Sequence, residues 1–367
     1  MSTSVGGASV DDRGERLPDD PGPLPSPPSG PLPGPLGAPL SGTQPRPPSA
    51  PLSGAQPWSS SEPLSGAPSG LFAKSLSWSR TVARELVHRD SVAEVLLTDV
   101  RPAGNGTYEA AASWPRSHPT FPRGGVDLHS PLMVVETLRQ LGIYLPLRYF
   151  AVPRDVRMVI TELFFEIDPA AEPRPASGAT QVTCRVRVGG VRRGADGEVT
   201  GLRLGVTYLA DGTPFARSGG GARFLGPERY DAVRKGRAAP VGDPGAPGGG
   251  AVRPDARALG VSGAHDVVIA ADGATLLVEP ADMRHPYFFD HATDHLPGMI
   301  VLEAARQAAA VESGGRLLRP TAGRLKTARF IEYLPAARVI CVPHHATCVF
   351  RFLQDGEQKA FGVLRYQ

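Results

Sequence analysis

The sequence predicts an α+β protein in which an antiparallel sheet wraps around a buried helix, and it predicts this arrangement twice. Three observations support the expectation: many short strand patterns, two helical segments that are apolar on every face, and an internal repeat that relates these two segments. A chain of 367 residues is long enough for two domains of ordinary size.

Composition separates the expected domains from the segments outside them. The chain has 39 prolines and 43 glycines, which concentrate in residues 1–74 and 236–257. Because such segments cannot bury a core, we expect a disordered tail at 1–74 and an interdomain linker at 236–257. The two folded domains then span residues 75–235 and 258–367.

Alternating apolar and polar residues mark the expected strands of both domains. In the first domain these strands are 92–100, 107–114, 159–167, 181–188, 202–209 and 215–224. In the second they are 265–270, 275–279, 326–334, 338–342, 347–353 and 359–366. An Asp-Gly pair at Asp211 and another at Asp355 predict the turn of the last hairpin in each domain.

One long helix is expected in each domain, over residues 132–145 and 299–311. Both segments are too apolar around their circumference to lie on a surface, so each helix should be buried. Pro146 is expected to end the first helix, and Pro297 to begin the second. A sheet wrapped around such a helix is the hotdog fold. We therefore expect tandem hotdog domains that pack as an intrachain pseudo-dimer.

The two helices carry the same motif, Glu-x-x-Arg-Gln, and this motif is part of an internal repeat. A single offset relates the two motifs and also three other matched pairs of residues. These pairs are His118 and His285, Asp127 and Asp294, and Gly106 and Gly273. Four features in one register indicate a duplicated domain.

Within each motif, Glu, Arg and Gln lie on one face of the helix. Buried charges are costly unless paired, so we expect pairing within each helix or across the two. The pairs either hold the domains in register or border a shared active site. For the second, a buried carboxylate with a raised pKa acts as a general base and an arginine binds a phosphate. The catalytic candidates are Glu136, Arg139, Glu303 and Arg306.

Other residues near the motifs are candidates for substrate binding. Gln140 and Gln307 share the polar helix face, and His118 and His285 occupy matched positions before the helices. Either histidine is equally well explained as a strand-end residue satisfied by backbone hydrogen bonds. Free N–H groups near Gly298, at the start of the second helix, can polarise a thioester carbonyl.

Several classes of function are excluded by composition. A net charge of +3 without a basic cluster argues against nucleic acid as a partner. No apolar run of membrane-spanning length and no signal sequence are present, and three cysteines without a C-x-x-C pair are typical of the reducing cytoplasm. His291 and His295 stand near two aspartates, but the first half lacks such a group. We therefore expect a cytoplasmic protein without a metal site, a cofactor or a membrane partner.

Three segments resemble the A-factor biosynthesis (AfsA) hotdog family: residues 87–99, 136–140 and 294–307. The resemblance covers about residues 85–225 and 262–367. It implies an acyltransferase of γ-butyrolactone signal synthesis, which joins a β-ketoacyl chain from acyl carrier protein to the hydroxyl of dihydroxyacetone phosphate. In the hypothesis that follows, a motif glutamate deprotonates this hydroxyl while a motif arginine binds the phosphate.

Three alternatives remain beside this one. The segment from Pro297 to Gln307 also resembles the central helix of hotdog dehydratases, which carry a catalytic histidine eight residues earlier. Phe289 and, in the first half, Pro122 stand there instead, which disfavours dehydration. A thioesterase uses water in place of the hydroxyl substrate. A regulator that only binds an acyl ligand needs neither water nor a hydroxyl substrate, because it catalyses no reaction.

Overall fold

The computed structural model describes residues 75–116, 118, 120, 128–174, 178–234 and 251–367. The expected tail and most of the expected linker lie outside these residues. Leu71–Gln367 form one compact unit. In the described part of this unit, no helix is both long enough and apolar enough to cross a membrane.

Within the described residues, each half contains six strands and one long helix. The first half comprises β1 (Leu97–Gly104), β2 (Thr107–Pro115), α1 (Leu132–Tyr149), β3 (Arg157–Ile167), β4 (Ala179–Arg193), β5 (Val199–Ala210) and β6 (Thr213–Leu225), followed by the short helix α2 (Pro227–Arg234). The second half comprises β7 (Ile269–Asp272), β8 (Thr275–Val278), α3 (Gly298–Glu312), β9 (Ala322–Thr327), β10 (Arg338–His344), β11 (Thr347–Gln354) and β12 (Glu357–Arg365).

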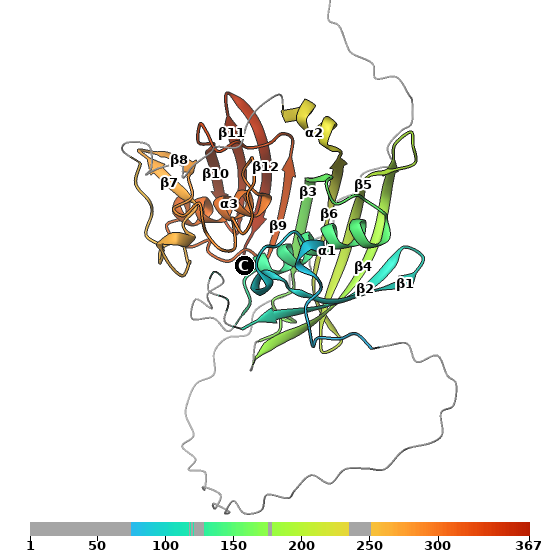
Figure 1. Ribbon diagram of the computed structural model, residues 1–367. Coiled ribbons are helices and arrows are strands. Elements are labelled where there is room, and N and C mark those ends of the chain that lie inside the picture. The colour runs from blue at the N-terminus through green and yellow to red at the C-terminus, as the bar shows by residue number, and fades with distance from the viewer. Residues whose placement is uncertain (1–74, 117, 119, 121–127, 175–177, 235–250) are drawn as a thin grey trace, which may run out of the picture. The chain divides into compact units, whose positions relative to one another are not determined.

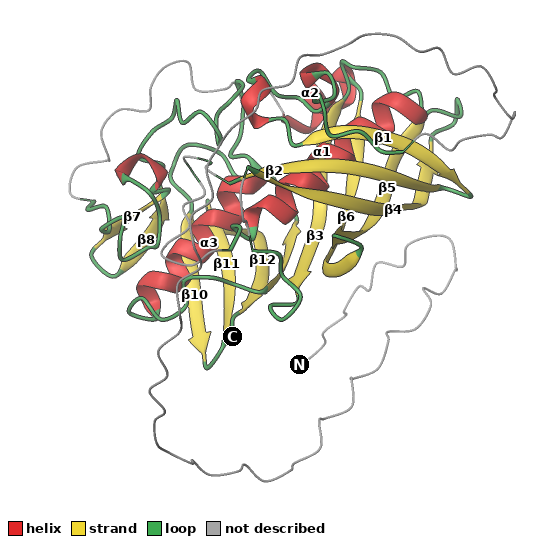
Figure 2. Cartoon of the chain, turned by 90° about the horizontal axis from the view of Figure 1, so that it is seen from below, coloured by secondary structure: helices red, strands yellow, loops and turns green. Residues whose placement is uncertain are grey.

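All of these strands belong to one antiparallel sheet that runs through both halves (Figures 1 and 2). Its order is β1-β2-β4-β5-β6-β3 and then β9-β12-β11-β10-β8-β7. The second series is the first in reverse, with equivalent strands at equivalent places. The halves therefore join through their own equivalent strands, β3 and β9, where Glu162 pairs with Lys326 and Phe165 with Gly323.

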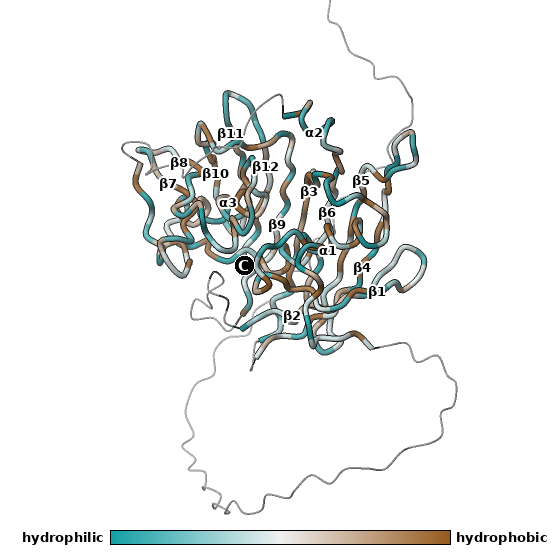
Figure 3. The backbone as a smooth tube through the Cα atoms, in the orientation of Figure 1, coloured by the Kyte–Doolittle hydropathy of each residue, from teal (hydrophilic) through white to brown (hydrophobic). Residues whose placement is uncertain are grey.

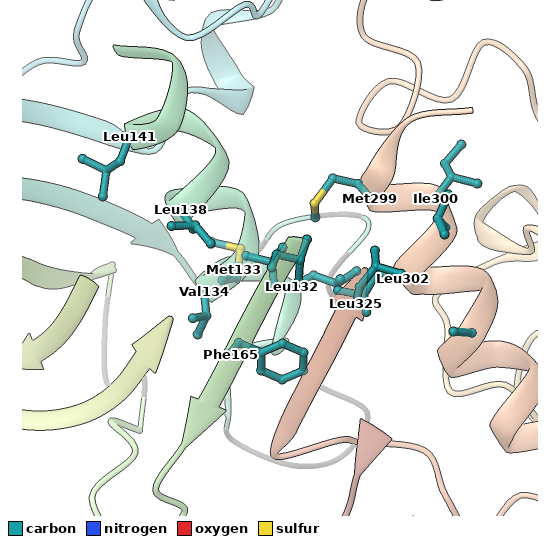
Figure 4. Packing of buried hydrophobic residues seen from close by; sticks show 14 of the residues in the cluster. Leu132, Met133, Val134, Leu138, Leu141, Phe165, Met299, Ile300, Leu302 and Leu325 are labelled. Atoms are coloured by element: carbon teal, nitrogen blue, oxygen red, sulfur yellow. The ribbon is translucent and has the colours of Figure 1, made fainter. Parts of the chain in front are cut away.

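The two long helices lie against the sheet, as the apolar patterns predict (Figure 2). Helix α1 contacts β3 and β6, and α3 contacts β10. Hydrophobic stretches run along α1 and β3 (Figure 3). One continuous core crosses the junction, where Met133 and Phe165 of the first half share a cluster with Met299 and Leu325 of the second (Figure 4). This architecture confirms the expected tandem hotdog fold.

Several local expectations are wrong. The strand expected over residues 326–334 is instead β9, which ends at Thr327, and the strand expected from residue 265 begins only at Ile269, after a 3-10 turn at Ala264–Asp266. Helix α1 does not end at Pro146 but continues to Tyr149. Proline removes only one backbone donor, and Leu145 and Pro146 are both buried, which outweighs that loss. The expected strand from residue 92 is also wrong, because Val92–Glu94 form a single 3-10 turn before β1. The side chain of Gln140 in α1 accepts the backbone N–H of Leu96 and donates to the carbonyl of Glu94, which holds this segment out of the sheet.

Candidate functional site

The motif glutamine of α1 fastens the helix to the segment before β1. Gln140 Oε1 accepts the backbone N–H of Leu96 at 2.9 Å, and Gln140 Nε2 donates to the carbonyl of Glu94 at 2.8 Å. The same amide donates to Glu136 Oε1 at 2.7 Å. Arg139 holds this carboxylate through Nε at 2.8 Å and Nη2 at 3.0 Å. Glu136 and Arg139 thus pair within one helix.

The motif of α3 repeats this arrangement. Gln307 accepts the backbone N–H of Val268 at 2.9 Å and donates to the carbonyl of Asp266 and to Glu303, both at 2.8 Å. Arg306 donates to Glu303 through Nε at 2.9 Å and Nη2 at 2.5 Å. Because both halves share this network, the duplicated motif has a structural role in each. The catalytic roles of the four charged residues stay predictions.

The matched histidines are also bound in equivalent ways. His118 Nε2 lies 2.9 Å from a carboxylate oxygen of Glu94, and His285 Nε2 lies 2.9 Å from one of Asp266. In each ring, Nδ1 accepts the backbone N–H two residues further along, at 3.2 and 3.1 Å. Both histidines are buried. The geometry agrees with the alternative of backbone-satisfied residues, and their binding of substrate stays a prediction.

In the part of the chain that the structure describes, one group has the residue types of a metal site. Ligand atoms of His265, Asp266 and His285 lie within 4.8 Å of one another. Because Nδ1 of His285 accepts backbone N–H groups, its Nε2 carries the proton and donates to Asp266. His118 makes the same bond in the first half, where Ala93 stands at the place of His265. The shared bond explains the group as structural.

A second repeated segment lies before the first strand of each half, at residues 87–94 and 259–266. In both, the carbonyl of the first residue accepts a hydrogen bond from the motif arginine, at 3.3 and 2.8 Å. In both, the second residue has a left-handed backbone, with a φ of 49° at His88 and 65° at Gly260. The sequence offset between these two segments differs from the offset between the two helical motifs. The single offset that relates the motifs therefore does not reveal that the segments are equivalent.

The two segments differ at their third residue, which is Arg89 in the first half and connects the two halves. Arg89 is almost fully buried, whereas Val261 takes its place in the second half. Arg89 Nη2 lies 2.9 Å from Glu136 Oε1, and its Nη1 donates to the carbonyl of Tyr287 at 2.7 Å. Its guanidinium carbon also lies 4.8 Å from the centre of the Tyr287 ring. Arg89 therefore links the first motif to the second half.

Asp290 ties the same segment to the loop that precedes α3. Its carboxylate accepts the backbone N–H groups of Asp90 at 2.7 Å and Ser91 at 3.0 Å. It also lies 3.8 Å from Arg89 Nη1. These contacts hold the residues next to Asp290 against the start of the first half.

The expectation that Glu136 has a raised pKa is wrong. Burial alone would raise the pKa of this carboxyl, but the charges of Arg139 and Arg89 outweigh burial and lower it to about 2. A carboxylate this acidic and this fully bonded is a poor general base. Its place in the structure is to hold two guanidinium groups.

Positive charge surrounds His88 and His291 at this junction. Burial, together with Arg139, His291 and Arg157, lowers the pKa of His88 to about 4. Burial and the charges of Arg139 and Arg89 lower the pKa of His291 as well. His291 Nδ1 is buried without a hydrogen-bond partner. The sequence marks His291 only as a candidate metal ligand, and it indicates no role for His88 or Arg89.

The two motif arginines differ in how completely they are bonded. Arg306 uses all three of its nitrogens, since its Nη1 donates to the carbonyls of Leu259 at 2.8 Å and Leu318 at 3.0 Å. Arg139 bonds through Nε and Nη2, and its side chain is 15% exposed. Arg139 is therefore the motif arginine with donor capacity left for a ligand.

A second polar cluster joins α2 to the segment before α3. Arg234 lies 2.8 Å from Glu332 and 3.1 Å from Asp294. The hydroxyl of Tyr230 donates to Asp294 at 2.7 Å, and His295 Nδ1 lies 2.7 Å from the same carboxylate. Every one of these groups has a partner, so the cluster positions the start of α3.

Gly298 is the first residue of α3, one residue later than the expected start at Pro297, which is the N-cap. The preceding Pro297 offers no side-chain cap, and its carbonyl accepts the N–H of Ile300 at 2.9 Å. A Cβ at Gly298 would lie 3.5 Å from Ile160 Cδ1 of β3, which is ordinary contact. The helix start thus lies beside the first strand of the junction, and its role in binding a thioester stays a prediction.

Known proteins similar to this chain agree with the fold. The family model of the A-factor biosynthesis hotdog domain (AfsA) matches residues 73–225 and 264–314. A curated relative from Streptomyces virginiae, named 2-oxo-3-(phosphooxy)propyl 3-oxoalkanoate synthase, is 33% identical over 69% of this chain and 84% of its own. A relative of the same name from Streptomyces griseus is 30% identical over 69% of this chain and 82% of its own.

Among solved structures, an acyl-ACP thioesterase from Bacteroides thetaiotaomicron is 10% identical. The match covers 72% of this chain and 98% of the thioesterase, with a TM-score of 0.43. A likeness of this size carries no argument about chemistry. The family model and the curated relatives decide the assignment: the chain belongs to the A-factor biosynthesis (AfsA) hotdog family.

Proposed function

We propose that the chain is a 2-oxo-3-(phosphooxy)propyl 3-oxoalkanoate synthase of γ-butyrolactone-type signal biosynthesis. It transfers a 3-oxoacyl group from acyl carrier protein to the hydroxyl of dihydroxyacetone phosphate. The observation that carries the proposal is the Streptomyces virginiae relative of that name, which matches this chain over 84% of its own length at 33% identity.

The reaction requires a site for the phosphate of the acceptor. The positive charges of Arg139 and Arg157 both lower the pKa of His88 at the junction of the halves. Arg139 also keeps N–H donors that can bind a ligand. A guanidinium group binds phosphate well because its planar donors match two phosphate oxygens. We assign binding of the phosphate to Arg139, with Arg157 near it at the junction. We assign Arg306 a structural role within the second half.

We further infer that the two halves act as an intrachain pseudo-dimer with one working site. The mirrored strand order and the β3–β9 junction support a two-fold relation. The residue types differ, by contrast, at three matched positions: Gly260 stands at the place of His88, Val261 at that of Arg89, and Thr120 at that of Tyr287. Acyl carrier protein is the expected donor, and the cytoplasm is the expected compartment.

The proposal is tested by incubating the full chain with 3-oxoacyl carrier protein and dihydroxyacetone phosphate. Mass spectrometry should detect the phosphorylated ester together with free carrier thiol. Dihydroxyacetone, which lacks the phosphate, is the matched acceptor and should react far more slowly. Hydrolysis alone, at a rate that the acceptor does not change, would instead support a thioesterase. Binding without turnover would support a regulator.

A further inference from the structure

His88 has a backbone conformation that its equivalent residue achieves with glycine. Its φ is 49°, and that of Gly260 is 65°. The left-handed region is unfavourable for residues with a Cβ atom, and glycine adopts it freely. The duplicate copy has glycine at this position, whereas His88 adopts the same unfavourable conformation. This indicates that the imidazole ring has a function.

Contacts on both sides hold His88 in place. The carbonyl of the preceding Val87 accepts a hydrogen bond from Arg139 at 3.3 Å. The following Arg89 is bound to Glu136 and to the carbonyl of Tyr287. The backbone of His88 is therefore positioned by α1 and by the second half together. Pre-organisation of this kind is what a catalytic side chain requires.

Charged groups from three elements act electrostatically on His88. Arg139 comes from α1, Arg157 from β3, and His291 from the loop before α3, which Asp290 anchors to the backbone beside His88. His118 and His285 use both ring nitrogens in structural hydrogen bonds, and Glu136 is saturated by Arg89, Arg139 and Gln140.

We propose that His88 is a catalytic residue that takes the proton of the acceptor hydroxyl as this hydroxyl attacks the thioester. The inference rests on the proposed function. The hydroxyl oxygen forms a bond to the acyl carbon, and the bond from that carbon to sulfur breaks. The proton passes to the imidazole and then to the departing thiolate, which leaves as the carrier thiol.

The surroundings suit this role. Burial and the nearby positive charges lower the pKa of His88 to about 4, so without the acceptor the ring is unprotonated at neutral pH and is a weak base. A phosphate dianion bound at Arg139 and Arg157 offsets those charges. Acceptor binding should therefore raise the pKa of the ring and make it a stronger base when it is needed.

The decisive variant is His88→Gly. The second half adopts the same backbone with glycine, so the variant should fold and have a Tm at least equal to that of the wild type. Its kcat for ester formation should fall by about 100-fold or more, while KM for dihydroxyacetone phosphate changes by less than roughly threefold. His88→Asn, which also tolerates a left-handed backbone and offers no base, should lose activity to the same extent.

The matched control is His345→Gly. His345 also has a φ of 49°, and it is exposed in the turn between β10 and β11, away from the junction. This variant should keep the kcat of the wild type.

Three outcomes are distinguishable. If the wild type forms the ester and the His88→Gly variant keeps more than a third of the wild-type kcat, the role of His88 is overturned and the proposed function stands. A fall in Tm that accompanies the loss assigns His88 a structural role. No ester from the wild type overturns both.

Discussion

At the scale of single residues, Glu136 illustrates how two opposing effects on a buried carboxyl are resolved. Burial disfavours its charge, but two guanidinium groups within hydrogen-bonding distance favour the charge more strongly. The sequence shows Glu136 and Arg139 as neighbours on a helix. It does not show Arg89, because that contact depends on tertiary packing between segments 47 residues apart.

Replacing Glu136 by glutamine should destabilise the protein strongly. The variant removes the carboxylate that pairs with both Arg89 and Arg139 and leaves Arg89 only the more distant carboxylate of Asp290 at 3.8 Å, which costs about 3–5 kcal/mol. Glu166→Gln is the control, because Glu166 pairs at the surface with Arg217 and Arg365 and should lose about 1 kcal/mol or less. Urea unfolding measures both. Equal losses in the two variants would contradict this account of Glu136.

The pKa of Glu136 also predicts how stability changes with pH. The unfolded carboxyl binds a proton near its ordinary pKa of 4.5, and the folded one near 2. The stabilisation is therefore complete above pH 4.5 and is lost as the pH falls from 4.5 toward 2. Thermal unfolding across this range should be steeper in pH for the wild type than for Glu136→Gln. Parallel curves would argue against the shift.

The two motif arginines should respond differently to the same change. Arg139→Lys removes the planar donors assigned to the phosphate and should raise KM for dihydroxyacetone phosphate by roughly tenfold or more. Arg306→Lys alters an arginine whose nitrogens all bind its own half, so it should lower Tm and leave KM unchanged. Steady-state kinetics on both variants decides. A similar KM for the two would remove the assignment of the phosphate to Arg139.

At the scale of elements, the sequence predicts the helices and most strands because their apolar patterns have clear periods. The prediction from sequence fails where side chains, and not a neighbouring strand, form the hydrogen bonds of the backbone. Gln140 holds the backbone of Glu94 and Leu96, so the residues before β1 turn instead of extending. The similarity of His88 to Gly260 is equally hidden, because it is a similarity of backbone and not of residue type.

Asp290 should control the order of the segment before β1. Its carboxylate accepts two backbone N–H groups from that segment, and Asp290→Asn leaves only one acceptor oxygen. Hydrogen exchange at Asp90 and Ser91 should become faster by roughly tenfold, equivalent to about 1.4 kcal/mol. Asp282→Asn is the control, since Asp282 accepts only a local N–H from Arg284. Unchanged exchange at Asp90 in Asp290→Asn would show that the clamp does not order the segment.

At the scale of the whole molecule, the two halves share both a sheet and a core. The internal repeat in the sequence predicts two similar domains, and the β3–β9 pairing shows how they join. The repeat cannot reveal that Tyr287 and Asp290 of the second half bind the segment before β1 in the first. Such contacts depend on the packing of the halves and leave no periodic signal.

A shared core predicts cooperative unfolding. Phe165 is buried at the junction beside β9, and Phe165→Ala should cost about 3–5 kcal/mol. The loss should appear in both halves, as seen by Trp114 fluorescence in the first and by hydrogen exchange in β11 of the second. If the two probes shifted by different amounts, the halves would be separate folding units.

The central claim is that a duplicated fold carries one acceptor site, at the junction, where the residues differ between the halves. Calorimetric titration of the full chain with dihydroxyacetone phosphate tests it most directly. The account predicts one molecule bound per chain, with binding weakened by Arg139→Lys and unaffected by Arg306→Lys. Two equivalent molecules per chain, one for each Glu-x-x-Arg-Gln motif, would contradict it.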